Sequence, residues 1–140
     1  HLAPGGFSSF GDGLAKSYVP SLIIGGDKDN TTPLDVELQP IYDALQTPRA
    51  LATVRGAGHM HFTDVCTLPF AKSVQQLKSM CEIDGGIAAD RAATVVQGLV
   101  LAFLDRYLKG ESGAASVLAP SDPHPAFAEV SVQSVGIASK

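Results

Sequence analysis

Short apolar runs bounded by glycine and proline alternate with a segment of helical periodicity in the first half of the chain. The run Tyr18–Gly26 holds Leu22, Ile23 and Ile24 in succession, which is typical of a strand buried on both faces, and we expect it to be a central strand. A second run, Ala50–Val54, ends at a Gly-Ala-Gly turn. The order strand, helix, strand with short connections predicts a βαβ unit with parallel strands.

The helix between these strands has a predicted start and a predicted break. Thr32 offers an N-cap hydroxyl, Pro33 suits the first helical position, and Asp35 places a carboxylate in the first turn. Pro40 is expected to kink or split the helix, which ends before Pro48. Its apolar positions are Leu34, Leu38, Ile41 and Leu45.

The second half of the chain predicts two helices, a loop and an edge strand. A polar helix is expected over Phe70–Glu82, and Asp90 is expected to cap a long helix that ends at Gly110. Small, polar and proline residues over Glu111–Pro125 predict a loop or mobile linker, and alternation over Ala128–Gln133 predicts an edge strand. The apolar stripe of the long helix consists of Val95, Val96, Leu99, Val100, Phe103, Leu104 and Tyr107.

These elements predict an α/β fold with a mostly parallel sheet and helices on both faces. Two or three strands cannot fully cover the apolar stripe of the long helix, and a parallel sheet needs helices on each face. We therefore expect the chain to be an incomplete fold.

The composition bears on two questions: which classes of partner the protein can bind and in which cellular compartment it works. Charged residues make up only 17% and the net charge is −4, so the sequence predicts no nucleic-acid partner. No apolar run approaches the roughly 20 residues of a membrane span. Cys66 and Cys81 form an even pair that suits a disulfide in an exported protein, or two buried thiols. A secreted or periplasmic location is favoured, with a cytoplasmic one as the alternative.

Candidate chemistry lies after the two predicted strands. Asp29 follows the first strand and His59 the second, and the carboxyl ends of parallel strands meet at one sheet edge. A carboxylate beside an imidazole fixes its tautomer and prepares it to accept a proton from a nucleophile. We expect Met60 and Phe62 to line a substrate pocket, and His61 to shape that pocket or to lie on the surface.

A metal site is the rival interpretation of the same region. His59 and His61 lie close in sequence to Asp64 and Cys66, but the set lacks a clear ligand spacing and supporting partners. We therefore predict no metal. His124 is interpreted as an ordered tail residue without a functional role.

The string from Val19 to Phe62 resembles the last two catalytic turns of α/β-hydrolases of the dienelactone-hydrolase, cutinase-like polyesterase and bacterial acetylhydrolase type. The resemblance implies that Asp29 is the acid and His59 the base of a Ser-His-Asp triad, with Asp27 in a supporting position. Residues 95–110 are similar to the closing helix of that family.

The resemblance implies a three-layer α/β/α sandwich in which residues 1–110 form the C-terminal portion of the domain and residues 111–140 a tail. The expected activity is hydrolysis of a carboxylic ester without a cofactor. Substrates in that fold are selected largely by loops, so small, lipid and polymeric esters are all open.

The serine of such a triad is missing from these residues. No stretch reads G-x-S-x-G, and Ser8 and Ser9 lack the strand-turn-helix context of a nucleophile elbow. His1-Leu2-Ala3-Pro4 resembles the end of the preceding strand. We expect the N-terminal half of the fold, with the serine and oxyanion hole, to come from an upstream segment or a second chain. The alternative is a non-catalytic binding module that kept the fold.

Overall fold

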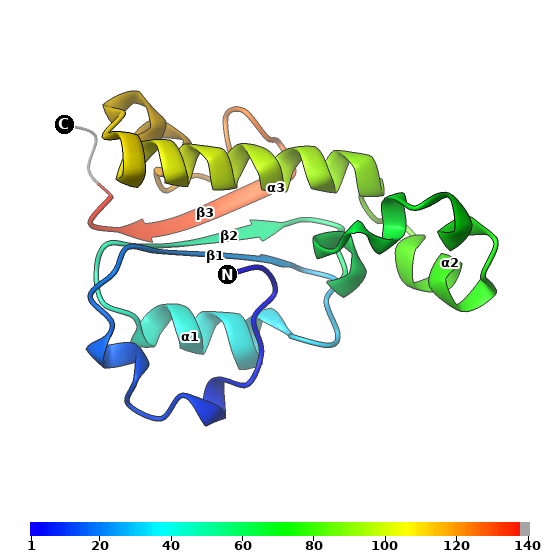
Figure 1. Ribbon diagram of the computed structural model, residues 1–140, viewed down its shortest axis with the longest axis horizontal. Helices are drawn as coiled ribbons and strands as arrows, with labels where there is room; N and C mark the ends of the chain where they lie inside the picture. The colour runs from blue at the N-terminus through cyan, green and yellow to red at the C-terminus, as the bar shows by residue number, and fades with distance from the viewer. Residues whose placement is uncertain (138–140) are drawn as a thin grey trace.

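A three-stranded mixed sheet with helices on both faces forms the centre of the computed structural model, which describes residues 1–137. Strands β1 (Ser21–Gly26) and β2 (Arg49–Val54) pair in parallel, and β3 (Val130–Val135) pairs antiparallel with β2. The long helix α3 (Ala89–Leu104) lies along one face and α1 (Gln39–Ala44) on the opposite face (Figure 1). The predicted α/β class and the parallel βαβ unit are confirmed.

Strand β1 is buried on both faces because its side chains alternate between two apolar clusters. Leu22 and Ile24 pack toward α3 with Val95 and Leu99, whereas Ile23 packs toward α1. The predicted burial is correct, but the strand begins at Ser21, and the preceding residues 18 and 19 are exposed. Among the three named strands β2 is the middle one, but β1 also has a partner on each side, β2 on one edge and the N-terminal residues on the other, in keeping with its predicted place inside the sheet.

The outer edge of β1 is paired with the N-terminal residues. Leu2 forms a parallel bridge with Ile24, the Ala3 N–H donates to the Ile24 carbonyl at 2.7 Å, and the Ile24 N–H donates to the His1 carbonyl at 2.9 Å. The N-terminal segment, which was predicted to be the end of a neighbouring strand, therefore does pair with β1 through its backbone.

Two predicted helix caps are wrong. A π-helical turn, Leu34–Leu38, leads into α1 with Pro33 as its N-cap residue and no side-chain cap, because the Thr32 hydroxyl bonds elsewhere. Helix α3 begins at Ala89 rather than after Asp90, whose carboxylate accepts the N–H of Arg91. The helical path does change at Leu38, two residues before the proline that was expected to split it.

Helix α2 (Gln75–Cys81) is shorter than the predicted helix over residues 70–82. A separate 3-10 turn, Pro69–Lys72, precedes it, because Val74 adopts an extended conformation that interrupts the helix. Helix α2 contains no buried residue and lies beyond the carboxyl ends of β1 and β2 (Figure 1).

The segment after α3 is more ordered than its composition indicates. A π-helical turn, Asp105–Lys109, ends at Gly110 in the left-handed conformation, as expected for a helix C-terminus. The expected loop over residues 111–125 instead contains a 3-10 helix, Ser112–Leu118, whose last residue is fully buried in the α3-side core. The interpretation as a mobile linker is therefore wrong, because Leu118 anchors the segment under α3.

Strand β3 confirms the predicted edge strand, shifted by two residues. His124 precedes it and is only 2% exposed. Its Nδ1 accepts the N–H groups of Ala126 and Phe127, both at 3.1 Å, and its Nε2 lies 2.7 Å from the Val117 carbonyl. The side chain thus organises the turn into β3. Residues 138–140 of the predicted tail lie outside the described residues.

Candidate active site

Asp29 lies in the turn that follows β1, with its side chain fully buried. Oδ1 accepts the N–H of Thr31 at 2.8 Å and of Thr32 at 2.9 Å, and Oδ2 accepts the Thr32 hydroxyl at 2.8 Å. Local backbone and side-chain donors thus satisfy a buried carboxylate. The turn holds the carboxylate in one orientation.

His59 lies in the turn that follows β2 and faces the same carboxylate. Its Nδ1 lies 2.9 Å from Asp29 Oδ2, and 35% of its side chain is exposed. The parallel register pairs Gly26 with Val54, so both turns leave the sheet at the same edge. Because a carboxylate can only accept, Nδ1–H donates to Asp29 and Nε2 is left able to accept a proton.

The charge of Asp29 is stabilised by its hydrogen bonds. Burial alone raises the pKa of this carboxyl, but hydrogen bonds from Thr32, His59 and Thr31 outweigh burial and hold the pKa below its ordinary value of 3.8. Asp29 is therefore ionised at neutral pH.

This pKa predicts an acid-dependent loss of stability. A carboxyl whose pKa is lowered by folding stabilises the folded state above its unfolded pKa, and that contribution is lost as the pH falls through the folded pKa. Asp29→Asn is expected to cost about 1 to 3 kcal/mol at pH 7 and to flatten the stability curve below about pH 4. Urea unfolding of both proteins from pH 7 to pH 2.5 measures this. Parallel curves would contradict the assignment.

The two turns are joined by further hydrogen bonds beside the pair. Asp27 Oδ1 accepts the Gly56 N–H at 2.6 Å, and the Lys28 N–H donates to the Ala57 carbonyl at 3.0 Å. Asp27 therefore cross-links the turn before His59 to the turn that holds Asp29. This contact is consistent with the supporting position that the resemblance implies for it.

The three residues after His59 have different surroundings. Met60 lines the same pocket as His59, whereas Phe62 packs against the α3-side core. His61 is 4% exposed, with Nδ1 accepting the Gly58 N–H at 3.2 Å and Nε2 lying 3.0 Å from the Ile87 carbonyl. These contacts assign the proton of His61 to Nε2. Its contacts fix the shape of the turn.

A pocket of about 500 Å³ opens beside His59. Asn30 and Thr31 line it from the Asp29 turn, and Met80 and Ile83 line it from the segment that contains α2. A side chain on Gly58 would overlap Ile83 Cδ1, so the glycine lets Ile83 pack directly on the His59 turn. The residues around α2, which the sequence did not connect with the site, form one wall of this pocket.

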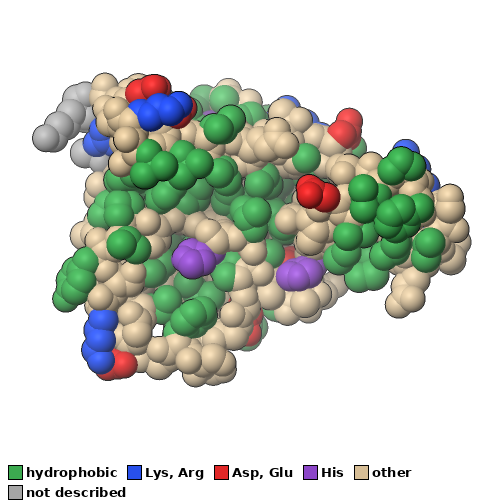
Figure 2. Space-filling model, in the orientation of Figure 1, with side chains coloured by type: hydrophobic (Ala, Val, Ile, Leu, Met, Phe, Trp, Pro, Cys, Tyr) green, Lys and Arg blue, Asp and Glu red, His purple; other side chains and the backbone are tan. Residues whose placement is uncertain are grey.

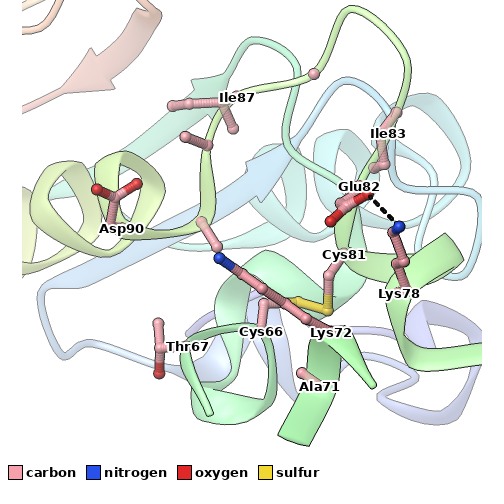
Figure 3. A pocket seen from close by; sticks show the side chains of 13 residues that line it. Cys66, Thr67, Ala71, Lys72, Lys78, Cys81, Glu82, Ile83, Ile87 and Asp90 are labelled. Atoms are coloured by element: carbon pink, nitrogen blue, oxygen red, sulfur yellow. Dashed lines mark ion pairs between the residues drawn. A yellow bond between two sulfur atoms is a disulfide. The ribbon is translucent and has the colours of Figure 1, made fainter. Parts of the chain in front are cut away.

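A disulfide between Cys66 and Cys81 ties α2 to the turns that follow His59. The predicted pairing is confirmed. The bond lines a second pocket, of about 610 Å³, which Ile87 and Asp90 border on the opposite side (Figure 3). Since α2 buries none of its own residues, the disulfide is a main restraint on the wall formed by Met80 and Ile83.

Reducing this disulfide is expected to loosen that wall. The bond joins residues 15 positions apart, and closing a loop of this length stabilises a fold by about 3 kcal/mol. Thermal unfolding with and without a reductant measures the loss, and amide hydrogen exchange locates it in residues 75–81. A Cys66→Ser/Cys81→Ser protein is the control and should not respond to reductant. An unchanged exchange rate in α2 would contradict the restraint.

No group of three His, Cys, Asp or Glu side chains among the described residues could hold a metal ion. Cys66 is engaged in the disulfide, and His59 is paired with Asp29. Ser8 and Ser9 lie exposed in the 3-10 turn Phe7–Ser9, and no hydrogen bond joins them to the pair.

Thr32, which contacts both Asp29 and His59, was predicted from the sequence to be a helix cap, and this role is wrong. Its spacing three residues after Asp29 is a signal for a local side-chain hydrogen bond, but the following proline favoured a helix cap.

Comparison with known proteins gives no family model that matches the chain and no match among curated proteins. Within residues 1–137, no helix has both the length and the apolar character required to cross a membrane. The fold and the site define an α/β protein with a buried carboxylate paired to an imidazole at the carboxyl edge of its parallel strands.

Proposed function

We propose that the chain is the C-terminal part of an α/β-hydrolase that hydrolyses carboxylic esters through a Ser-His-Asp triad. The observation that carries the proposal is the 2.9 Å hydrogen bond between the fully buried Asp29 and the partly exposed His59, from turns that follow adjacent parallel strands. A hydrogen bond between two fully exposed residues would support the proposal much less, because ion pairs on the surface contribute little free energy and form easily by chance.

In the proposed reaction, a serine hydroxyl from a segment beyond these residues attacks the ester carbonyl carbon while His59 Nε2 takes its proton. The imidazolium then gives that proton to the alkoxide of the ester as the carbon–oxygen bond breaks, which leaves an acyl-enzyme. Water repeats the sequence with the same histidine and releases the acid. Asp29 orients His59 and stabilises its charged form throughout.

In the proposed three-layer sandwich, further strands would extend the sheet on the side where the N-terminal residues pair with β1. Leu2 already pairs in parallel with Ile24 on that edge, and an apolar pocket of about 370 Å³ lies there between Leu2, Val19 and Leu104. Hydrophobic side chains gather on the face between α3 and the N-terminal segment (Figure 2). A strand and helix that carry the serine would cover this apolar surface.

The alternative is a non-catalytic binding module, and the same apolar edge favours it. Such a module would bind another chain over the apolar surface beside β1 and the N-terminal segment rather than complete a catalytic site. The pocket beside His59 instead favours the esterase. Met60 and Met80 border this pocket and offer an apolar surface to the acyl or alcohol group of a small or polymeric ester. The disulfide supports a secreted or periplasmic location for either function.

The test is labelling of the native preparation with a fluorophosphonate, which adds to activated serines, followed by intact mass measurement under denaturing conditions. A labelled longer chain, or a labelled second polypeptide that copurifies with this one, is expected. An unlabelled 14.5 kDa chain alone would overturn the esterase and favour the binding module.

A further inference from the structure

Thr32 touches both members of the Asp29–His59 pair. Its hydroxyl donates to Asp29 Oδ2 at 2.8 Å, its backbone N–H donates to Oδ1 at 2.9 Å, and Oγ1 lies 3.4 Å from His59 Nδ1. The residue is 7% exposed. Thr32 is thus a buried side chain in contact with the same carboxylate oxygen that accepts the histidine proton.

The hydroxyl has one hydrogen and two lone pairs, which decides how these contacts are shared. Its hydrogen is committed to Asp29 Oδ2, because the carboxylate can only accept. A lone pair is therefore left for the Nδ1–H of His59, as a weaker second acceptor beside Oδ2. Both contacts of His59 Nδ1, with Asp29 Oδ2 and with Thr32 Oγ1, therefore require the histidine proton to be on Nδ1.

Helix capping does not account for the orientation of the Thr32 hydroxyl. The adjoining helical turn begins at Leu34 with Pro33 as its N-cap and takes no side-chain cap, so the hydroxyl is not used to start the helix. The Thr32 methyl lies against Gly5, where an added Cβ would approach Cγ2 to 2.8 Å. That contact favours the rotamer that turns the hydroxyl toward the carboxylate.

We propose that Thr32 is a positioning residue that holds Asp29 Oδ2 on His59 and keeps the histidine in the tautomer with its proton on Nδ1. The positioning concerns the described residues alone, and only its catalytic consequence rests on the proposed esterase. In that enzyme the tautomer leaves Nε2 free to accept the serine proton. Loss of the hydroxyl removes one of the contacts that fix Oδ2, so the carboxylate can turn away from Nδ1 and the proton is no longer held there in preference to Nε2.

The test compares Thr32→Val, which keeps the shape and removes the hydroxyl, with Thr32→Ser, which keeps the hydroxyl. Nitrogen-15 NMR of the His59 ring at pH 8 reports the tautomer in the 140-residue chain without any need for turnover. We expect the Nδ1–H form in the wild type and in Thr32→Ser, and a mixture of tautomers in Thr32→Val. The same substitution is expected to raise the pKa of Asp29 toward its ordinary value, because one of the hydrogen bonds that lowers it is removed.

Thr53→Val is the matched control, because Thr53 is also buried and no hydrogen bond joins its hydroxyl to the pair. It should leave the His59 spectrum unchanged. A second measurement needs no variant: the Thr32 hydroxyl proton of the wild type should exchange slowly and show a nuclear Overhauser effect to the His59 Nδ1 proton. An unchanged tautomer in folded Thr32→Val, or no such effect in the wild type, would overturn the proposal.

In the serine-bearing protein, Thr32→Val is expected to lower kcat about tenfold to a hundredfold with little change in KM, as for loss of one hydrogen bond to a charged group, with recovery in Thr32→Ser. If no form hydrolyses esters while the tautomer still responds to the hydroxyl, the proposed function fails and the positioning role stands. If esters are hydrolysed but the tautomer does not respond, the positioning role fails alone.

Discussion

His59→Ala in the serine-bearing protein is expected to lower kcat for ester hydrolysis by at least about a thousandfold, while the fold keeps its stability. The imidazole is partly exposed, and its hydrogen bonds within the described residues are to the Asp29 turn, so its removal creates no large cavity. Without it no group is placed to take the serine proton. Kinetics with an aryl ester, together with thermal unfolding of each protein, measure the two effects separately.

His124→Ala is the matched control, since this histidine is buried and bonded to the backbone of the turn before β3. It is expected to lose stability, about 1 to 3 kcal/mol, and to keep the kcat of the folded molecules. A kcat that survives His59→Ala would reject the triad. If affinity for a partner chain also survived, the binding module would be the better account.

The βαβ unit could be predicted from the sequence because its signals are local. Leu22 to Ile24 form an apolar run too short for a helix, and the glycines after both strands mark their ends. A helical connection between two strands makes them parallel, and parallel strands present their carboxyl ends at one edge. The proximity of Asp29 and His59 is therefore a consequence of topology that sequence reasoning can reach.

The contacts that refine the site depend on partners far away in the chain or on competition between local bonds. Thr32 could cap a helix or bond a carboxylate, and the buried charge of Asp29 favours the second because an unsatisfied carboxylate is costly to bury. Ile83 reaches the Gly58 turn only because the segment around α2 folds back. Leu118 lies in a stretch of small residues that gives no sign of a buried side chain, and its burial depends on the position of α3.

Gly26→Ala is expected to lower stability and, in the proposed enzyme, catalysis, because Gly26 lies directly against the backbone of the turn that precedes His59. An added Cβ would overlap the carbonyl oxygen of Ala57, which is backbone and cannot rotate away as a side chain would. That oxygen accepts the Lys28 N–H, one of the bonds that join the turns of Asp29 and His59. We expect a loss of about 2 to 4 kcal/mol in the free energy of unfolding.

The same displacement is expected to separate Asp29 from His59, and in the proposed enzyme a shift of about 1 Å in a reacting group can cost on the order of a hundredfold in rate. Gly113→Ala is the control, because its added Cβ meets no atom within 4 Å, and it should change neither quantity. Urea unfolding gives the stability, and kcat of the folded serine-bearing variant gives the rate. If Gly26→Ala lowered stability but left kcat unchanged, the close approach of the two strand ends would serve the fold alone, and the Asp29–His59 geometry would not depend on it.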